Sequence, residues 1–354
     1  MICFMKNIID KLEQKQTLSK SDWMTLFQNF TPSDSAYLYE RARHIQRQHY
    51  GNQIFIRGLI EFTNYCKNDC YYCGIRRSNQ NAIRYRLTKQ DILNCCDTGY
   101  ELGFRTFVLQ GGEDGHFTDE LLVDLVTTIR NKFPDCAITL SVGERSYDSY
   151  QALYQAGANR YLLRHETYDP THYAKLHPPE LSAIARQKCL KNLKKIGYQV
   201  GTGIMVGSPW QTPENLAEDM LFMKELNPQM VGIGPFIPHH ATPFADQTAG
   251  TLELTLFLLG AIRLMLPKVL LPATTALGTI APDGREKGVL AGANVVMPNL
   301  SPTDTRKNYL LYDNKLCTGD EAAESVEHLK QSMKKIGYEV VVSRGDSLNT
   351  NSKL

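Results

Sequence analysis

The sequence has little net charge and no long uncharged apolar run. Its 39 Lys and Arg residues nearly balance its 37 Asp and Glu residues, which leaves a formal charge of +2. A broad positive surface for nucleic acid or an anionic membrane is therefore not expected, and neither is predicted as a partner. The longest apolar stretch, residues 254–271, is interrupted by Arg263 and Lys268. It predicts a buried helix and not a membrane span.

Cysteine is too scarce for a disulfide framework and secretion signals are also missing. The 354 residues contain nine cysteines, an odd number, whereas disulfide scaffolds are short, dense and evenly paired. The apolar start, residues 1–4, is shorter than the apolar core of a secretory signal. We therefore expect a cytoplasmic protein in a reducing compartment, in which some cysteines have a chemical use.

From residue 53 onward, short β-branched runs alternate with segments of helical period, an order typical of parallel α/β proteins. Eight strands are predicted, at residues 54–61, 106–110, 137–142, 161–164, 199–205, 230–234, 269–274 and 294–297. Helices are predicted between them at residues 89–102, 119–132, 147–156, 184–196, 213–226 and 252–266. Eight such units in about 250 residues predict a (β/α)8 barrel of the TIM type.

The segments that flank the predicted barrel differ in composition. Residues 1–52 contain only helical patterns and predict an N-terminal helical cap. The barrel is expected over residues 53–342, with a C-terminal helix near residues 321–336. The polar tail, residues 343–354, is predicted to be disordered. Because no low-complexity linker interrupts the chain, one large domain is favoured over two.

The most specific motif is a C-x3-C-x2-C run, Cys66, Cys70 and Cys73, directly after the first predicted strand. Three thiolates this close in sequence can converge on one metal centre. A cubane iron–sulfur cluster with three protein ligands keeps one iron open for an exogenous ligand. A zinc site would need a fourth Cys or His nearby, and the loop contains none. The motif therefore favours a cluster over zinc and over three unrelated thiols.

Polar residues and glycines gather where the next predicted strands end, which is the edge at which a barrel carries its active site. Paired glycines allow a ligand to approach the backbone closely, and a carboxylate beside a guanidinium suits an amino acid moiety or a ribose. Surface ion pairing remains the alternative for any single charged residue. The residues concerned are Gln110, Gly111, Gly112 and Glu113, then Ser141 and Glu144, then Arg164 and Glu166.

Two further features suggest ligands. Arg160 and Arg164 are four residues apart across one predicted strand, so they share a face. Two like charges inside a barrel are costly unless an anion lies between them, so an internal anion site is predicted. His239 and His240 follow Pro238 in a predicted loop, where solvated histidines are the commoner alternative to a metal site.

The cysteine run resembles the cluster motif of radical S-adenosylmethionine (SAM) enzymes. The resemblance implies one 4Fe–4S cluster held by the three cysteines, with SAM bound to its open iron and cleaved reductively to a 5′-deoxyadenosyl radical. It further implies that the segment from Gln110 to Glu113 contacts the SAM amino group, with Ser141 and Glu144 nearby. Glu166 and Arg186 would hold the SAM ribose and carboxylate.

A longer resemblance, over residues 53–312, is to the HydE family of FeFe-hydrogenase maturases. It lies in residues 56–57, 61–64, 73–77, 84–86, 160–167, 230–239, 272–276 and 292–299. It implies assembly of the di-iron subcluster of the hydrogenase on a small anionic, organometallic substrate, a cysteine-bound iron carbonyl cyanide species. Other hydrogenase maturases, and a reductant such as ferredoxin or flavodoxin, would be partners. The implied substrate cavity is lined by Arg57, Arg160, Arg164, Thr274, Thr275 and Tyr312.

One departure from that family concerns a second cluster. Several members carry three further C-terminal cysteines, whereas this chain keeps only Cys317 there, so no second cluster is expected. Three alternatives stay open: a methylornithine-synthase-like mutase, a biotin-synthase-like sulfur inserter, and a non-catalytic iron–sulfur scaffold. The sulfur inserter is disfavoured because the predicted strands lack cysteines for a sacrificial cluster. Cys95, Cys96, Cys136 and Cys189 are predicted to be buried structural thiols.

Overall fold

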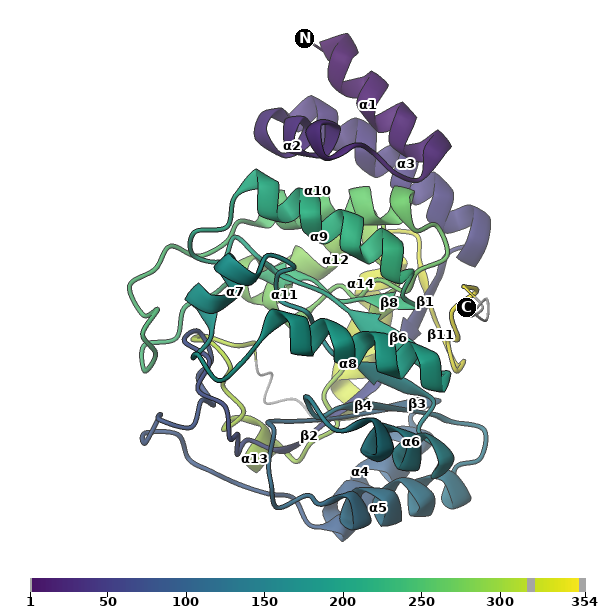
Figure 1. Cartoon of the computed structure of the whole chain (residues 1–354). Helices are drawn as coiled ribbons and strands as arrows, with labels where there is room; N and C mark the ends of the chain where they lie inside the picture. The colour runs from purple at the N-terminus through teal and green to yellow at the C-terminus, as the bar shows by residue number, and fades with distance from the viewer. Residues whose placement is uncertain (1, 317–321, 350–354) are drawn as a thin grey trace.

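The computed structural model describes residues 2–316 and 322–349, and its parallel strands close into a barrel surrounded by helices (Figure 1). Six strands are hydrogen-bonded in the order β2-β3-β4-β5-β6-β8. Isolated bridges from Met230 to Leu270 and from Pro272 to Val295 continue the ring, and β10 then pairs with β1. The predicted (β/α)8 architecture is confirmed. The ring strands are β1 (Gln53–Ile56), β2 (Gly58–Thr63), β3 (Thr106–Gly111), β4 (Ala137–Ser141), β5 (Arg160–Leu162), β6 (Gln199–Thr202), β8 (Met230–Val231) and β10 (Val295–Val296).

Several predicted strands are shorter or divided. The first predicted strand breaks at Arg57 into β1 and β2. The strand β1 pairs with β10, whereas β2 pairs with β3. The strand expected at residues 199–205 divides at Gly203, and β7 (Met205–Val206) pairs with β9 (Gly234–Pro235) instead of continuing the ring. Residues 269–274 form bridges only.

The outer layer consists of helices that follow the strands, and several begin at a Ser or Thr whose side chain accepts a hydrogen bond from the first turn, such as Thr88, Thr118 and Ser146. Such caps satisfy backbone N–H groups that would otherwise lack partners. The helices are α4 (Lys89–Glu101), α5 (Asp119–Lys132), α6 (Tyr147–Gln155), α7 (Pro170–Leu176), α8 (Ala183–Ile196), α9 (Pro213–Leu226), α10 (Leu252–Met265), α11 (Thr275–Ile280) and α12 (Gly284–Leu290).

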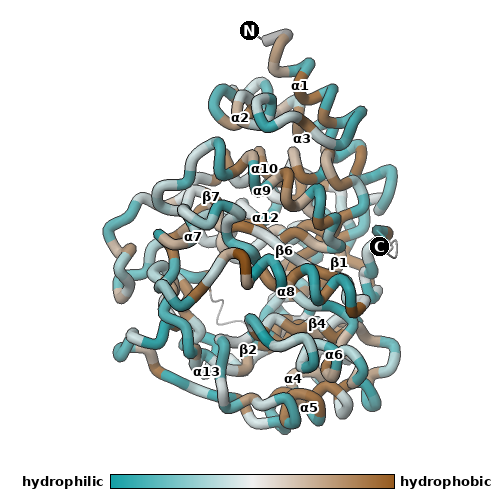
Figure 2. The backbone as a smooth tube through the Cα atoms, in the orientation of Figure 1, coloured by the Kyte–Doolittle hydropathy of each residue, from teal (hydrophilic) through white to brown (hydrophobic). Residues whose placement is uncertain are grey.

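Three N-terminal helices stand on one side of the barrel: α1 (Ile2–Lys15), α2 (Lys20–Asn29) and α3 (Pro32–Tyr50). The helix α2 packs on α9, and α3 packs on α10. The apolar stretch predicted as a buried helix is α10, and Figure 2 shows brown, apolar segments where α9 and α10 lie beneath the N-terminal helices. Within the described residues, no helix combines the length and hydrophobicity needed to cross a bilayer.

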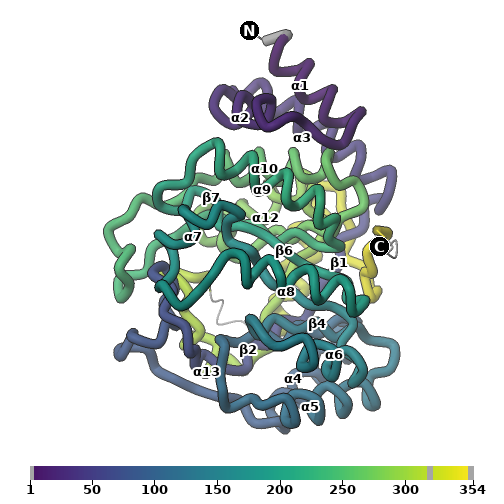
Figure 3. Tube along the Cα trace, in the orientation of Figure 1, coloured from purple at the N-terminus to yellow at the C-terminus, as the bar shows by residue number. Residues whose placement is uncertain are grey.

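The C-terminal part of the chain returns to the start of the barrel strands, where the yellow segment lies beside β1 (Figure 3). After α13 (Thr303–Arg306) and α14 (Ala322–Lys335), β11 (Glu339–Val341) pairs in parallel with β1. Residues 343–349 differ from the predicted disorder. Arg160 donates hydrogen bonds to the carbonyls of Arg344 and Gly345 and to the Asp346 carboxylate, so a polar tail can be fixed by a buried cation. Residues 350–354 lie outside the described residues.

Candidate active site

The loop after β2 carries the three motif cysteines at the open end of the barrel, each partly buried. The backbone N–H of Cys73 donates to the carbonyl of Cys70 at 3.3 Å, which folds the second half of the motif back on itself. Burial raises the pKa of the Cys66 thiol, raises that of Cys70 far above its ordinary value, and raises that of Cys73 to about 12. The ligand-free thiols are therefore protonated at neutral pH, and metal binding releases their protons.

Two arginines fix this loop from outside the motif. Arg76 donates two hydrogen bonds to Asp69, at 2.7 and 2.6 Å, and this bidentate geometry is the strongest form of the pair. Arg84 donates to four backbone carbonyls, and these belong to Asn64, Ile75, Arg76 and Asn79. The loop is thereby held in its curled form by groups that do not themselves reach a ligand.

The glycine segment after β3 lies against the cysteine loop. The N–H of Glu113 donates to Cys66 Sγ at 3.4 Å, and the N–H of Lys67 donates to the Glu113 carbonyl at 2.9 Å. A methyl group at Gly112 would overlap the carbonyl oxygen of Tyr65 and the side chain of Cys66. Close approach between two backbones, and not a tight turn alone, is therefore what requires glycine at this position.

Charged residues from three elements meet next to this segment. Glu113 Oε1 accepts a hydrogen bond from the N–H of Glu144 at 3.0 Å. Glu144 in turn forms an ion pair with Arg186, on α8, with 2.9 Å between Oε1 and Nε. Those two atoms are buried and not aligned for a hydrogen bond, so both retain capacity for a polar ligand. The structure therefore brings together Glu113, Glu144 and Arg186 as predicted for one site.

Arg164 and Glu166 follow β5, and Arg164 Nη2 donates to Glu166 Oε2 at 2.8 Å. The Glu166 carboxylate raises the pKa values of Cys70, Tyr72 and Cys73, in addition to the larger effect of their burial. It therefore lies on the same side of the barrel mouth as the thiols. Gln110, one residue before the end of β3, and Ser141, the last residue of β4, lie at the same level because they are register partners.

Tyr72, between two of the motif cysteines, is held by a histidine that sequence reasoning missed. His177 Nδ1 lies 3.0 Å from the carbonyl of Tyr173, so this nitrogen carries the proton. His177 Nε2 then accepts from the Tyr72 hydroxyl at 3.2 Å. Burial lowers the pKa of His177 to about 3, so its imidazole stays neutral. A lone histidine in a loop gives no sequence signal for this contact.

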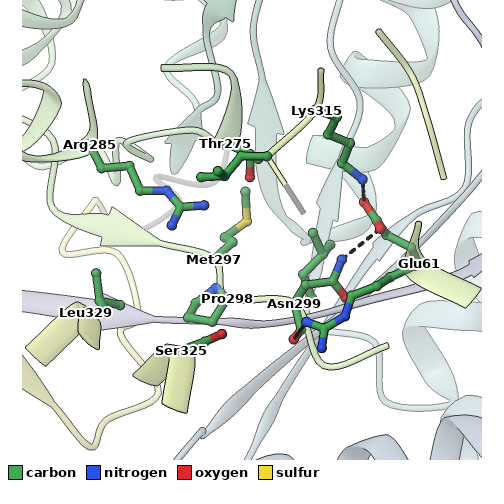
Figure 4. A pocket seen from close by; sticks show the side chains of 12 residues that line it. Glu61, Thr275, Arg285, Met297, Pro298, Asn299, Lys315, Ser325 and Leu329 are labelled. Carbon is green, nitrogen blue, oxygen red and sulfur yellow. Dashed lines mark hydrogen bonds and ion pairs between the residues drawn. The ribbon is translucent and has the colours of Figure 1, made fainter. Parts of the chain in front are cut away.

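A pocket beside the barrel mouth contains Thr275 and further charged residues that the sequence motifs did not indicate (Figure 4). Buried Glu61 accepts hydrogen bonds from Lys315 Nζ at 2.5 Å and from Asn299 Nδ2 at 2.8 Å. Arg285 reaches into the same pocket, and its Nε is buried without a hydrogen-bond partner among the described residues. Among the described residues, this Nε therefore remains available to a polar ligand, while the charge of Glu286 acts on the guanidinium.

Tyr312 and Thr274 lie near this pocket. Burial raises the pKa of Tyr312 to about 12, and the charges of Glu61, Arg285 and Arg164 act on it. Thr274 precedes α11, and its hydroxyl is buried without a hydrogen-bond partner among the described residues. Tyr312 is thus within electrostatic reach of both the pocket and Arg164, and Thr274 directly precedes Thr275 of the pocket; that these residues line one substrate cavity stays a prediction.

Arg57 and Arg160 lie elsewhere, in a small cavity near the N-terminal ends of the strands. Arg160 Nη2 is 2.7 Å from Asp346 of the tail, whereas Arg164 pairs with Glu166. The anion expected between Arg160 and Arg164 is therefore replaced by two separate carboxylates of the chain. The prediction failed because β5 ends at Leu162: Arg160 begins the strand, whereas Arg164 follows its other end, so the two guanidinium groups reach different carboxylates.

His239, His240 and Asp313 place one ligand atom each within 4.8 Å of one another. His239 is buried and its Nδ1 accepts from the N–H of Ala241 at 3.0 Å. The ring proton must then be on Nε2, which is the nitrogen that faces Asp313 at 3.8 Å. That tautomer cannot offer Nε2 as a metal ligand, so the cluster is a hydrogen-bonded loop.

The remaining cysteines lie away from the motif. Cys95, Cys96 and Cys136 are buried as predicted, whereas Cys189 is only partly buried. Cys317, the residue on which the prediction of a single cluster depends, lies outside the described residues. Nothing in the described part of the chain bears on a second cluster.

Comparison with known proteins identifies the family. The Radical SAM superfamily matches residues 60–223, which span β2 to α9. A curated relative, the [FeFe] hydrogenase maturase subunit HydE of Thermotoga maritima, is 40% identical over 332 residues, or 94% of each chain. The chain belongs to the radical SAM superfamily. As a radical SAM protein it is an enzyme that uses a 4Fe–4S cluster and SAM.

Other radical SAM relatives agree on the fold. The 3-methylornithine synthase of Methanosarcina acetivorans is 30% identical over 90% of this chain and 89% of its own. The crystal structure of methylornithine synthase superposes with a TM-score of 0.83 at 28% identity, covering 94% of this chain and 97% of that one. The maturase HydG superposes with a TM-score of 0.80 at 19% identity, over 94% of this chain and 75% of its own.

The residues present suit the cluster of a radical SAM enzyme. The three motif cysteines lie on one loop, each partly buried, and the N–H of Glu113 donates to Cys66 Sγ at 3.4 Å, a contact that suits a thiolate ligand. The motif offers three thiols and no fourth protein ligand. This donor set matches a cubane with one open iron.

Proposed function

We propose that this radical SAM enzyme acts in the maturation of FeFe-hydrogenase, on a small anionic substrate. The proposal is carried by the 40% identity to the Thermotoga maritima maturase over 94% of both chains. When bound, the cluster supplies the electron that cleaves SAM to methionine and a 5′-deoxyadenosyl radical. The other hydrogenase maturases, and a ferredoxin or flavodoxin as reductant, are proposed as partners.

Cys66, Cys70 and Cys73 are proposed to hold the cluster, and the groups around them to orient SAM. The backbone of Gly111 and Gly112 and the carboxylate of Glu113 would receive the SAM amino group. Arg186 would bind the SAM carboxylate through an Nε that is already buried and lacks an aligned partner. The remaining proposed SAM contacts are Gln110, Ser141, Glu144 and Glu166.

The proposed substrate region extends from Arg164 and Tyr312 to the pocket of Figure 4. Thr274 and Thr275 offer hydroxyl groups there, and the buried Nε of Arg285, which has no hydrogen-bond partner among the described residues, favours an anionic ligand. Lys315 is neutralised by Glu61 at 2.5 Å, so Arg285 is proposed as the residue that binds the anion. Arg57 and Arg160 are proposed to support the barrel end from the far side.

The deciding experiment starts from the anaerobically reconstituted enzyme with SAM and dithionite. Formation of 5′-deoxyadenosine establishes radical chemistry, whereas its absence favours a scaffold. Addition of the enzyme to an assay that activates FeFe-hydrogenase apoprotein, together with the other maturases, then tests the physiological role. Hydrogen evolution that depends on this enzyme supports the proposal, and an unchanged rate without it contradicts the proposal.

A second candidate is a methylornithine-synthase-like mutase. It is favoured by 30% identity to 3-methylornithine synthase over 90% of the chain and by the TM-score of 0.83. The same incubation with lysine discriminates between the candidates, because a mutase converts the amino acid to an isomer of equal mass. A new product that co-elutes with methylornithine would favour the mutase.

A further inference from the structure

The backbone at Glu166 is strained. Its φ is +65°, a region that few residues other than glycine occupy. The N–H of Thr167 donates to the carbonyl of His165 at 2.8 Å, so Glu166 is the central residue of a three-residue γ-turn. The form of this turn with positive φ is rare and strained, and such backbone persists only where its surroundings enforce it. Something in the fold must therefore hold the turn.

The holding group is Asp219, a fully buried residue of α9. Its Oδ1 accepts a hydrogen bond from the N–H of Tyr168 at 2.6 Å and lies 3.2 Å from His165 Nε2. These two donors stand on either side of Glu166 and Thr167 in sequence. One carboxylate oxygen therefore fixes both ends of the strained turn to the same helix.

The ring of His165 is fixed from its other side as well. His165 Nδ1 lies 2.8 Å from the Thr202 hydroxyl, at the end of β6, and both residues are completely buried. Because Nε2 donates to Asp219, Nδ1 accepts from this hydroxyl. The N–H of Glu166 itself donates to the carbonyl of Gly203 at 3.1 Å. The turn is thus anchored to one helix and one strand.

Packing alone does not account for an aspartate at this position. The second oxygen of Asp219, Oδ2, is buried without a hydrogen-bond partner among the described residues. A buried carboxylate with an unsatisfied oxygen opposes folding, whereas an apolar side chain would fill the space without that penalty. The benefit of an aspartate here must come from the two hydrogen bonds to Oδ1, which fix the turn and so the direction of the Glu166 side chain.

We propose that Asp219 is a positioning residue, which sets the affinity for SAM by holding the strained turn that aims Glu166 at the cysteine loop. The inference rests on the proposed function, in which Glu166 contacts SAM. If φ at Glu166 relaxed to a negative value, its Cα–Cβ bond would point in another direction. The carboxylate would then leave both Arg164, 2.8 Å away, and the thiols.

The test is a double-mutant cycle on the reconstituted enzyme, with SAM affinity measured by anaerobic titration and turnover measured as 5′-deoxyadenosine at saturating SAM. Asp219→Ala is expected to weaken SAM binding about tenfold, with a much smaller change in saturated turnover. Asp219→Asn keeps an oxygen for the Tyr168 N–H and is expected to restore most of the affinity. In the Glu166→Gln background, Asp219→Ala is expected to have no further effect.

Additive effects of Asp219→Ala and Glu166→Gln would overturn the inference, and so would normal affinity in Asp219→Ala. Failure of the proposed function gives a different result, because Glu166→Gln would then itself leave SAM affinity unchanged. Met223→Ala is the matched control, since it removes another fully buried side chain of α9. If Asp219→Ala does not fold, Thr202→Val, which removes the hydroxyl partner of His165, is taken through the same cycle with the same criteria.

Discussion

Gly112 lies so close to the carbonyl oxygen of Tyr65 that the structure leaves no space for a side chain between them. The contact joins the segment after β3 to the first residues of the cysteine loop. Neither group can move freely, because Tyr65 is followed by Cys66 and Gly112 is followed by Glu113, whose N–H donates to Cys66 Sγ. Close packing of two backbones thus sets the position of Cys66, the first of the three proposed cluster ligands.

Gly112→Ala is therefore expected to displace the cysteine loop and lower cluster occupancy to less than about half, because overlap with backbone atoms cannot be relieved by a rotamer change. Iron content after anaerobic reconstitution measures this. Gly115→Ala is the control, since a methyl group there meets no atom within 4 Å. Equal iron content in both variants would show that the loop adapts and that the contact does not position Cys66.

Replacement of one motif cysteine tests the assignment of the ligands. Cys70→Ala is expected to reduce bound iron from about four per chain to nearly none and to abolish 5′-deoxyadenosine formation. Cys136→Ala removes a fully buried thiol outside the motif and is expected to leave the iron content unchanged, although it will lower stability. Retention of a complete cluster in Cys70→Ala would assign its ligand elsewhere.

The number of clusters is a separate prediction. With only Cys317 in the C-terminal region, the reconstituted wild-type protein is expected to bind about four irons per chain. Iron and sulfide analysis, with Cys317→Ala alongside, measures this directly. About eight irons per chain would refute the single-cluster prediction, and a loss confined to Cys317→Ala would identify that residue as a ligand.

The sequence predicted the barrel because each βα unit carries a local pattern, and it predicted a cluster-binding loop because three cysteines lie within eight residues. It could not predict partners that are distant along the chain. Asp346 lies 186 residues from Arg160, and Lys315 lies 254 residues from Glu61. Neither pair leaves a periodic or spaced signal. The strain at Glu166 was equally hidden, because no local motif requires positive φ at a glutamate.

Arg285 gives a prediction about substrate binding. Arg285→Met keeps a long side chain and removes both the positive charge and the buried Nε that has no hydrogen-bond partner among the described residues. We expect it to lower the apparent affinity for an anionic substrate about tenfold, because one charged hydrogen bond is lost. Cleavage of SAM in the absence of substrate should stay near the wild-type rate. If hydrogenase activation by the variant depends on substrate concentration as it does in the wild type, Arg285 is not part of the substrate site.

The tail contact between Asp346 and Arg160 makes a prediction about pH. Burial raises the pKa of Asp346, but the Arg160 guanidinium outweighs this effect, and the net pKa lies well below the ordinary value of about 3.9. A carboxylate whose pKa is lower in the folded state than in the unfolded state stabilises the folded protein. Its contribution is complete above the unfolded-state pKa and disappears as the pH falls through the folded-state pKa. The stabilisation is therefore complete at pH 7 and fades below about pH 4.

Asp346→Asn is accordingly expected to lower the free energy of unfolding at pH 7 by about 1 kcal/mol, near the range of exposed ion pairs, because the Asp346 side chain is 43% exposed. The difference from wild type should stay constant above about pH 5 and shrink progressively as the pH falls from about 4 toward the folded-state pKa of Asp346. Urea unfolding of both proteins without bound iron measures it, which avoids the acid lability of the cluster. Asp69 pairs with Arg76 in both proteins, so its own pH-dependent contribution to stability cancels in the comparison. A difference that stays constant over this range would mean that Asp346 acts through its shape or neutral hydrogen bonds and not through its charge on Arg160.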